Sequence, residues 1–428
     1  MKREQRYTRG LAGVNVPALR SHNAALVLDL LRTAGEAGIS RLELAERTGL
    51  TPQAVSKITA RLRAEGLAAE AGHRASTGGK PRTVLRLVPS AGHAVGVHLD
   101  RDELTTLLTD LAGTVVALRR RPVDLGEGAG PVLDAVTEEV RALLTDGATG
   151  GGGPTGAGEP PGPAPGPGPA LGSGPALGSG LASGSGLASG SGLASGPGLG
   201  HGPDPVLGPA SAPAPAPAPV LGVGVAMPGP LDHHAGVPGR VTGFPSWDGY
   251  PVRDELARRL GLPVVLDKDT NAAALGLALR PESPGSFAYV HLGTGLGAGL
   301  VLGGAPLRGD RTGAGELGHQ TVQLDGPPCG CGGRGCLEVL CLAAVARGEL
   351  PEAARILGAG AANLVRLLDI DQVLLGGRVV LGAPEVFADG AREVLAGLGL
   401  PTPVAVATAP QAVAVGAAWL VLAPIFGQ

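Results

Sequence analysis

Four side chains in the last third of the sequence could together bind one metal ion. They are His319, Cys329, Cys331 and Cys336, and the glycines between the cysteines permit the tight turns that would bring the sulfurs together. Three thiolates and one imidazole form the closed tetrahedral set that is typical of structural rather than catalytic zinc. Reduced cysteines without a metal are the alternative, although buried free thiols rarely cluster in a glycine-rich loop. The sequence therefore predicts a zinc site, with the remaining cysteine, Cys341, in the core of the following helix.

The first 90 residues could carry out a second kind of chemistry, the binding of nucleic acid. Residues 1–90 contain 15 Lys and Arg against 7 Asp and Glu, a net charge of +8, in a chain whose total charge is −3. The remainder is therefore acidic, at −11 by subtraction. A basic segment on an acidic body favours contact with nucleic acid at that end only. A chance fluctuation of charge is the alternative at this stage.

Helix signals in the basic segment indicate a helix-turn-helix. A first helix is expected from an apolar stripe behind a possible cap at Ser21, and the stripe contains Leu26, Val27, Leu30 and Leu31. A capping-box sequence from Ser40 to Glu43 opens a second helix, with Leu44 and Ala45 buried, which ends at Gly49. Thr51 then caps a third helix, with Pro52 at its first position, where a missing N–H costs nothing.

The third helix is expected to present one apolar face and one polar face. Val55, Ile58 and Leu62 recur at helical spacing and must face the first two helices. The opposite face suits a major groove, where Gln reads adenine and Lys or Arg reaches guanine or phosphate. The segments LAAEAG and TVLRLV can pair as a β-hairpin, and the basic HRASTGGKPR between them forms a wing along the DNA backbone or minor groove. The residues predicted to contact DNA are Thr51, Gln53, Ser56, Lys57, Arg61, Lys80 and Arg82. A protein-interaction module with a solvated polar face is the alternative.

Two stretches of the sequence resemble the ROK family, which is named for repressors, open reading frames and kinases. The run SRLELAERTGLTPQAVSKITARLRAEGLAAEAG, followed by TGGKPR, is similar to the winged helix-turn-helix of ROK regulators, with Lys80 where the family usually has Arg. The run GELGHQTVQLDGPPCGCGGRGCLE matches the family's zinc motif, C-x-C-G-x-x-G-C-x-E preceded by G-E-x-G-H, at every fixed position. The resemblance covers about 91–146 and 220–428, and it implies that zinc holds an ordered loop against a sugar pocket.

The resemblance also implies a hexose site. The positions that match the sugar-binding residues of ROK kinases are Lys268, Asp269, Glu316, His319 and Glu338. Carboxylates suit this task because each can accept two hydrogen bonds from hydroxyl groups. For each acid alone, a solvated loop carboxylate is the alternative. By the resemblance, Asp269 matches the general base of the kinases, and Lys268 replaces the usual Asn. An ion pair between Lys268 and Asp269 would change or abolish sugar binding.

The nucleotide side of the family pattern is altered. The family's first phosphate loop reads Asp-x-Gly-Gly-Thr, and the resemblance places His98, Asp100 and Arg101 at its Asp and two Gly. Without both glycines the backbone cannot approach phosphate closely, and Asp100 would repel it, so we expect no nucleotide binding. The runs HLGTGLGAGLVLGG and DQVLLGGRV resemble the phosphate-side and adenosine-side motifs, but glycine turns are needed for this fold in any case. The segment between Glu338 and Asn363 is shorter than is usual in the family, which affects the pocket floor and the dimer contacts.

Composition divides the chain into four parts. Residues 1–90 form the predicted winged helix-turn-helix domain, and 91–146 form the first part of the ROK domain. The Gly/Pro/Ala/Ser-rich stretch 147–219 is a predicted disordered insertion, because it cannot bury enough surface to offset its ordering entropy. It is either a tolerated expansion of a surface loop or a docking segment. Residues 220–428 complete the ROK domain. The predicted fold class is α/β, a winged helix-turn-helix followed by a two-lobed, actin-like and hexokinase-like (ribonuclease H-like) domain.

These observations favour a regulator without enzymatic activity, a sugar-responsive repressor of carbohydrate metabolism genes. The expected partners are a double-stranded DNA operator, a sugar or phosphosugar effector, and a second copy in a homodimer, with zinc as the cofactor. We expect a cytoplasmic protein without a membrane partner, because no run of about 18 apolar residues and no signal region occur. Two alternatives stay open: an ATP-dependent sugar kinase with a DNA-binding appendage, and an interaction scaffold that binds neither DNA nor sugar.

Overall fold

The computed structural model describes residues 22–74, 82–148, 218–241, 243–408 and 411–428. Most of the predicted insertion at 147–219, the predicted cap Ser21 and the predicted wing residue Lys80 lie outside the described residues. The predicted domain boundaries stay predictions.

The described residues before Val88 form a three-helix unit with a small antiparallel sheet. Its elements are α1 (His22–Thr33), the 3-10 helix η2 (Gly35–Ala37), β1 (Ile39–Ser40), α2 (Arg41–Thr48), α3 (Pro52–Ala64), β2 (Ala68–Arg74) and β3 (Arg82–Leu87). The predicted capping box is confirmed, since the Ser40 hydroxyl accepts from the Glu43 N–H and the Glu43 carboxylate accepts from the Ser40 N–H. Thr51 caps α3 by accepting from the Ala54 N–H at 3.2 Å.

Two details of this unit differ from the prediction. The buried face of α1 includes Leu28, while Leu26 and Leu30 are only half-buried. The hairpin of β2 and β3 is confirmed, but the sheet has a third strand, β1, which pairs with β3 to give the order β1-β3-β2. A two-residue strand leaves no alternating pattern in the sequence, because it is too short to repeat.

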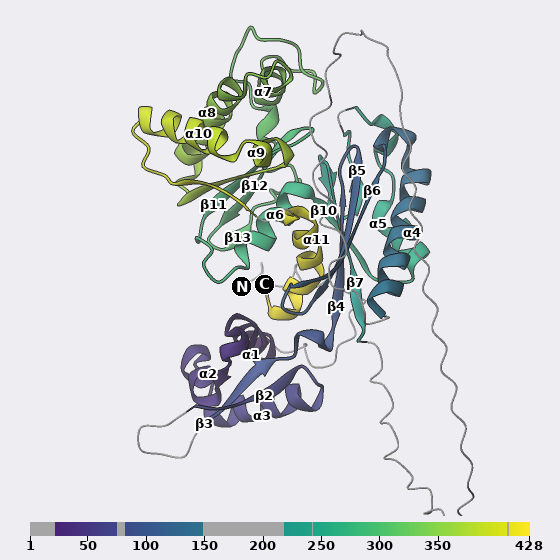
Figure 1. Ribbon diagram of the computed structural model, residues 1–428, viewed down its shortest axis with the longest axis vertical. Helices are drawn as coiled ribbons and strands as arrows, with labels where there is room; N and C mark the ends of the chain where they lie inside the picture. Colours follow the sequence, from purple (N-terminus) through teal and green to yellow (C-terminus); the bar gives the residue numbers. More distant parts are fainter. Residues whose placement is uncertain (1–21, 75–81, 149–217, 242, 409–410) are drawn as a thin grey trace, which may run out of the picture. The chain divides into compact units, whose positions relative to one another are not determined.

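The first lobe of the following α/β domain is built on a five-stranded sheet of order β10-β7-β4-β5-β6. Its strands are β4 (His93–Leu99), β5 (Glu103–Asp110), β6 (Val115–Pro122), β7 (Val220–Met227) and β10 (Val264–Lys268). The helices α4 (Ala129–Ala148) and α5 (Val252–Leu260) cover one face (Figure 1). Short elements connect these parts: η3 (Pro89–Ala91), η4 (Leu125–Glu127), β8 (Leu231–Asp232), β9 (Val237–Pro238) and η5 (Pro245–Trp247). The strands β10, β7 and β4 run parallel, which aligns the carboxyl ends of all three.

The second lobe contains another five-stranded sheet, of order β13-β12-β11-β14-β15. Its strands are β11 (Phe287–Leu292), β12 (Leu296–Leu302), β13 (Ala305–Pro306), β14 (Gln372–Gly376) and β15 (Val404–Val406). One face packs against α7 (Leu337–Ala346), α8 (Leu350–Leu368), α9 (Arg378–Gly382) and α10 (Pro384–Gly397) in a continuous apolar core. The 3-10 helix η6 (Leu317–His319) precedes α7 in the chain. The segment after Glu338 is therefore occupied by two helices joined through a short turn.

Two helices, α6 (Asp269–Ala278) and α11 (Ala412–Leu422), lie between the two sheets (Figure 1). Glycines let these elements approach without intervening side chains. A Cβ on Gly224 of β7 would overlap the carbonyl oxygen of Ala417 in α11, and one on Gly416 of α11 would overlap that of Ala272 in α6. The 3-10 helix η7 (Ala423–Phe426) continues from α11. No helix of the described ranges is both long and apolar enough to span a membrane.

Candidate ligand site and metal centre

The four predicted metal ligands converge on one point of the second lobe. His319 ends η6, Cys336 is the N-cap residue of α7, and Cys329 and Cys331 lie on the loop between them. One donor atom from each lies within 4.8 Å of every other. The Cys331 and Cys336 sulfurs are 3.7 Å apart, and the Cys329 sulfur is 3.8 Å from His319 Nδ1. Zinc–sulfur bonds of about 2.3 Å place two tetrahedral sulfurs about 3.8 Å apart, so this donor set fits one zinc ion.

Backbone hydrogen bonds hold the metal loop in this shape. The Cys329 N–H donates to the Gly333 carbonyl at 2.9 Å, and the Val322 N–H donates to the Gly335 carbonyl at 2.9 Å. Gly335 has a φ of 55° and lies directly over Gln323, where a Cβ would overlap the Gln323 carbonyl oxygen. Cys341 takes no part in the cluster. It is buried in α7, as predicted, and its thiol donates to a carbonyl of α8.

Three of the five predicted sugar-binding residues lie together at the carboxyl end of β10. Lys268 ends this strand, Asp269 begins α6, and Glu316 precedes η6. Lys268 is 3% exposed, and its ammonium group donates to Glu316 Oε1 at 3.0 Å and to the Ala314 carbonyl at 2.7 Å. The ion pair that the sequence suggested for Lys268 with Asp269 is therefore made with Glu316. The cause is the loop before η6, which the sequence places more than 40 residues away and the fold brings over Lys268.

The other two predicted sugar ligands lie on the metal side of the same region. His319 belongs to the metal cluster, and the Glu338 carboxylate in the first turn of α7 accepts from the Leu296 N–H at 2.7 Å. A Cβ on Gly318 would lie 3.2 Å from the Glu338 Cβ, so η6 and α7 are in close contact. An ion held by the cluster would fix both η6 and the start of α7, and with them Glu316 and Glu338.

The protonation of Asp269 is shifted by its surroundings. Burial raises the pKa of its carboxyl to about 7, and the nearby charges of Asp100 and Glu316 act in the same direction. Lys268 and the Thr270 N–H oppose the shift. Near neutral pH this side chain exists both as a carboxylate and as a carboxylic acid. It can therefore accept a hydrogen bond from a hydroxyl group or donate one to it.

Carboxylates of the altered first phosphate loop bridge the two lobes. Asp100, between β4 and β5, accepts from the Thr294 hydroxyl at 2.8 Å. Asp102 receives two hydrogen bonds from Arg378, at 3.0 and 2.8 Å. Thr294 belongs to the run HLGTGLGAGLVLGG, which resembles the phosphate-side motif, and Arg378 belongs to DQVLLGGRV, which resembles the adenosine-side motif. These contacts therefore join the elements that resemble a nucleotide site. Sequence reasoning missed Asp102, Thr294 and Arg378 because nothing local indicates their partners.

Two histidines line the same region without adding positive charge. Burial lowers the pKa of His98 below its ordinary value, and it lowers the pKa of His291 to about 4. Both imidazoles are therefore neutral at pH 7. Arg101 stacks over Phe244, with its guanidinium 5.6 Å from the ring centre. The segment from His98 to Asp102 therefore combines one neutral imidazole and two carboxylates with a single cation, Arg101, so negative charge outweighs positive charge where the family's phosphate loop would bind phosphate.

The predicted DNA-contacting residues of the third helix share one exposed face. Gln53, Ser56, Lys57 and Arg61 of α3 and its N-cap residue Thr51 are all exposed. On the opposite side Val55 and Leu62 are fully buried, and Ile58, which was also predicted to face the first two helices, is half-buried. Arg61 also pairs with Glu65, one turn further along, at 3.1 Å. Arg82 is exposed at the start of β3, and Lys80 lies outside the described residues.

Two ranges of the chain are similar to known protein families. The ROK family model matches residues 212–347, and a winged helix-turn-helix DNA-binding model matches residues 27–68. A glucokinase of Thermotoga maritima is 42% identical over 133 residues, which cover 30% of this chain and 42% of the glucokinase. A xylose repressor of Caldicellulosiruptor bescii is 22% identical over 402 residues, 83% of each protein. The chain spans 42% to 61% of the length of four of the curated relatives that it matches.

A solved structure of a ROK family transcriptional regulator, a homologue of the E. coli MLC protein, has the same fold. It superimposes with a TM-score of 0.63 at 21% identity, over 94% of this chain and 96% of the other. The fold is a winged helix-turn-helix followed by a two-lobed, actin-like sugar-kinase fold, as predicted. Repressor relatives extend over most of the chain, and kinase relatives match part of it. Residues 212–347 are therefore similar to the ROK family and residues 27–68 to winged helix-turn-helix DNA-binding domains, and the zinc-type donor cluster lies within the first of these ranges.

Proposed function

We propose that this protein is a transcriptional regulator, a repressor whose affinity for an operator is set by a small sugar. The observation that carries the proposal is the exposed polar face of α3, where four predicted DNA contacts, preceded by the exposed N-cap residue Thr51, lie opposite the fully buried Val55 and Leu62. Such a helix, preceded by a capped helix and a glycine turn, has the arrangement of a recognition helix in the major groove. The similarity to a xylose repressor over 83% of the chain supports the same assignment.

The ligand is a sugar bound between β10, η6 and α7, by Lys268, Asp269, Glu316, His319 and Glu338. Two observations support this assignment. The side chains of Lys268 and Glu316 meet directly, and Asp269 lies within electrostatic range of both. The group therefore offers acceptors and donors for several hydroxyl groups, as sugar recognition requires. Zinc held by His319 and the three cysteines has a structural role here, because a closed set of four protein ligands leaves no position for a substrate.

The protein has no kinase activity under this proposal. Phosphoryl transfer depends on backbone amides and cations placed around the triphosphate. Here Asp100 and Asp102 bridge the lobes at the altered phosphate loop, and His98 and His291 are neutral. A sugar kinase is the second candidate, because a carboxyl group with a pKa of about 7 at Asp269 could act as a general base and a glucokinase is similar over 133 residues.

The active form is a homodimer in the cytoplasm. Two winged helices related by a twofold axis would read the two halves of a palindromic operator. This part of the proposal follows from DNA binding and from the symmetry that operators require.

Two measurements on the purified full-length protein test the proposal. The protein is incubated with sheared DNA of its own genome at low ionic strength, and the retained fragments are sequenced; we expect enrichment of a few palindromic sites. Nucleotide consumption is then followed in a coupled assay with ATP and a panel that includes D-xylose and D-glucose. We expect turnover no faster than without sugar. Uniform retention of DNA together with sugar-dependent turnover that is lost in Asp269→Asn would instead establish the kinase.

A further inference from the structure

One arginine of the winged helix-turn-helix is buried against the ROK domain. Arg32 lies in the last turn of α1, and its side chain is 8% exposed. Its guanidinium pairs with Asp29 at 2.7 Å and donates through Nη1 to the Leu279 carbonyl at 3.1 Å. The same group lies 5.0 Å from the ring centre of Trp419 and 5.3 Å from that of Phe426. Few arginines are so buried without a specific role for each of their donors.

The carbonyl that Arg32 binds belongs to the C-cap of α6. This helix begins at Asp269, with Lys268 as its N-cap, and it ends with the Leu279 cap. Ten residues of α-helix span about 15 Å. The carbonyl end of a helix carries partial negative charge, which favours a cation such as Arg32. One short helix therefore connects the proposed sugar ligands at its first residue to the DNA-binding domain at its last.

The neighbouring helix α11 reaches Arg32 by a second route. A Cβ on Gly276 of α6 would lie 3.0 Å from the Gly416 Cα of α11, so the two backbones are in direct contact. No side chains separate these backbones there, and such close-packed interfaces transmit displacement instead of absorbing it. α11 carries Trp419, and η7 after it carries Phe426. Both aromatic rings contact Arg32.

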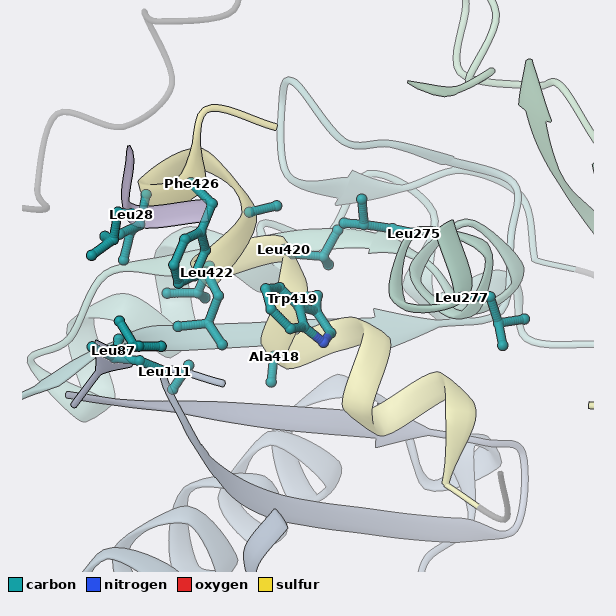
Figure 2. Close-up of a cluster of buried hydrophobic side chains, with 14 of the residues drawn as sticks. Leu28, Leu87, Leu111, Leu275, Leu277, Ala418, Trp419, Leu420, Leu422 and Phe426 are labelled. Carbon is teal, nitrogen blue, oxygen red and sulfur yellow. The ribbon is translucent and has the colours of Figure 1, made fainter. Parts of the chain in front are cut away.

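Apolar packing surrounds this arginine. Leu28 of α1 belongs to the same buried cluster as Trp419, Leu422 and Phe426, and it lies beside Phe426 (Figure 2). The Gln428 amide donates to Asp29, the ion-pair partner of Arg32, at 3.3 Å. The contact between the two domains is therefore specific, because the Arg32 guanidinium packs against two aromatic rings and donates a hydrogen bond to the carboxyl end of α6.

We propose that Arg32 is the positioning residue through which the ligand site controls the DNA-binding domain. The inference rests on the proposed function. A sugar that moves Lys268 and Asp269 shifts α6 along its axis, and α11 moves with it because their backbones touch. The Leu279 carbonyl and the two rings then change place relative to Arg32, and α1 follows. A ligand can shift the equilibrium only by its differential affinity for the two arrangements, and Arg32 supplies a contact that differs between them.

The test compares four versions of the full-length protein: wild type, Arg32→Met, Arg32→Lys and Arg355→Met. Methionine keeps most of the length of Arg32 but removes the charge and all donors. Arg355 is a matched control, since it is an exposed arginine of α8 that pairs with Glu352. DNA affinity is measured by fluorescence anisotropy on a retained genomic fragment, with and without saturating D-xylose or D-glucose. Binding of each sugar to the DNA-free protein is measured separately by calorimetry.

We expect the sugar to change the DNA affinity of wild type and Arg355→Met by about 5- to 150-fold, the usual range of coupling between two sites. In Arg32→Met the change falls below about 2-fold while sugar binding itself persists, and Arg32→Lys retains an intermediate response. An undiminished response in Arg32→Met overturns the inference and leaves the proposed function standing. A wild type that binds DNA without any sugar response contradicts the proposed function instead.

A second measurement needs no variant and stays informative if Arg32→Met fails to fold. Hydrogen exchange of the wild type is compared with and without the same sugar. We expect altered protection at the end of α6 and in the last turn of α1, because the contact at Arg32 loosens or tightens with occupancy. Unchanged protection of α1 under conditions where the sugar alters DNA affinity would show that the coupling runs elsewhere.

Discussion

The ion pair of Lys268 and Glu316 gives a sharp prediction, because its two members differ in exposure. The Lys268 side chain is 4% exposed and the Glu316 side chain is 33% exposed. Glu316→Gln leaves a buried ammonium group with the Ala314 carbonyl and a neutral amide as hydrogen-bond partners, and with Asp269 as a further electrostatic neighbour. Breaking a buried pair in this way costs about 3–5 kcal/mol, and we expect about 3 kcal/mol because the amide oxygen still accepts a hydrogen bond. Lys268→Met leaves a carboxylate that water can reach, so we expect about 1–2 kcal/mol.

Urea denaturation of the ligand-free protein measures both costs. The sequence contains two tryptophans, Trp247 and Trp419, and both are buried in the α/β domain, so fluorescence reports the unfolding of that domain. The double variant should lose less stability than the sum of the two single variants, by about 0.5–3 kcal/mol, because the residues are in contact. As a control, Arg355→Gln breaks an exposed pair and should cost less than about 1 kcal/mol.

The test is which of the two single variants loses more unfolding free energy. If Glu316→Gln proves no more destabilising than Lys268→Met, the burial of Lys268 does not govern the energetics of the site, and the reasoning is wrong.

Three further predictions concern other parts of the fold. Cys336→Ser should lower the bound zinc from one ion per chain towards none and lower the melting temperature, whereas Cys341→Ala should keep the zinc; metal analysis and calorimetry compare them. Because the folded pKa of Asp269 is raised to about 7, above the unfolded value of about 3.9, its ionisation progressively destabilises the fold from pH 4 to pH 7. Asp269→Asn should remove this loss of unfolding free energy, which we place at about 1–4 kcal/mol at pH 8. The prediction is wrong if the unfolding free energies of the wild type and of Asp269→Asn depend on pH with the same slope. Gly416→Ala should cost about 1–3 kcal/mol through overlap with α6, whereas Gly397→Ala, with open space around it, should be neutral or stabilising by up to about 1 kcal/mol in the same denaturation assay.

Local features were readable from the sequence because each depends on residues close together in the chain. The four donors of the metal cluster span fewer than 20 residues, and glycine turns between them suffice to bring them together. The caps at Ser40 and Thr51 act within three residues, so their chemistry was visible without the fold. The hairpin of β2 and β3 was equally local, although its tip lies outside the described residues.

Contacts between distant residues could not be read in this way. Lys268 was expected to form an ion pair with Asp269 because the two are neighbours in sequence. In the fold it pairs with Glu316, which comes from a distant loop. The bridge from Asp102 to Arg378 and the bond from Arg32 to Leu279 each join residues more than 200 positions apart. Their existence depends on the order of strands in two sheets and on the glycine-mediated contact of α6 with α11, which no periodicity in the sequence encodes.

The central proposal is that this protein binds DNA with an affinity that changes when a sugar binds to the same chain. The most direct measurement is the anisotropy of a labelled genomic fragment titrated with the full-length protein, with and without saturating sugar, at constant salt concentration. We expect saturable binding, with the protein concentration at the midpoint changing at least about fivefold when the sugar is added. Saturable binding that the full panel of sugars leaves unchanged, or no binding at low ionic strength, would contradict it.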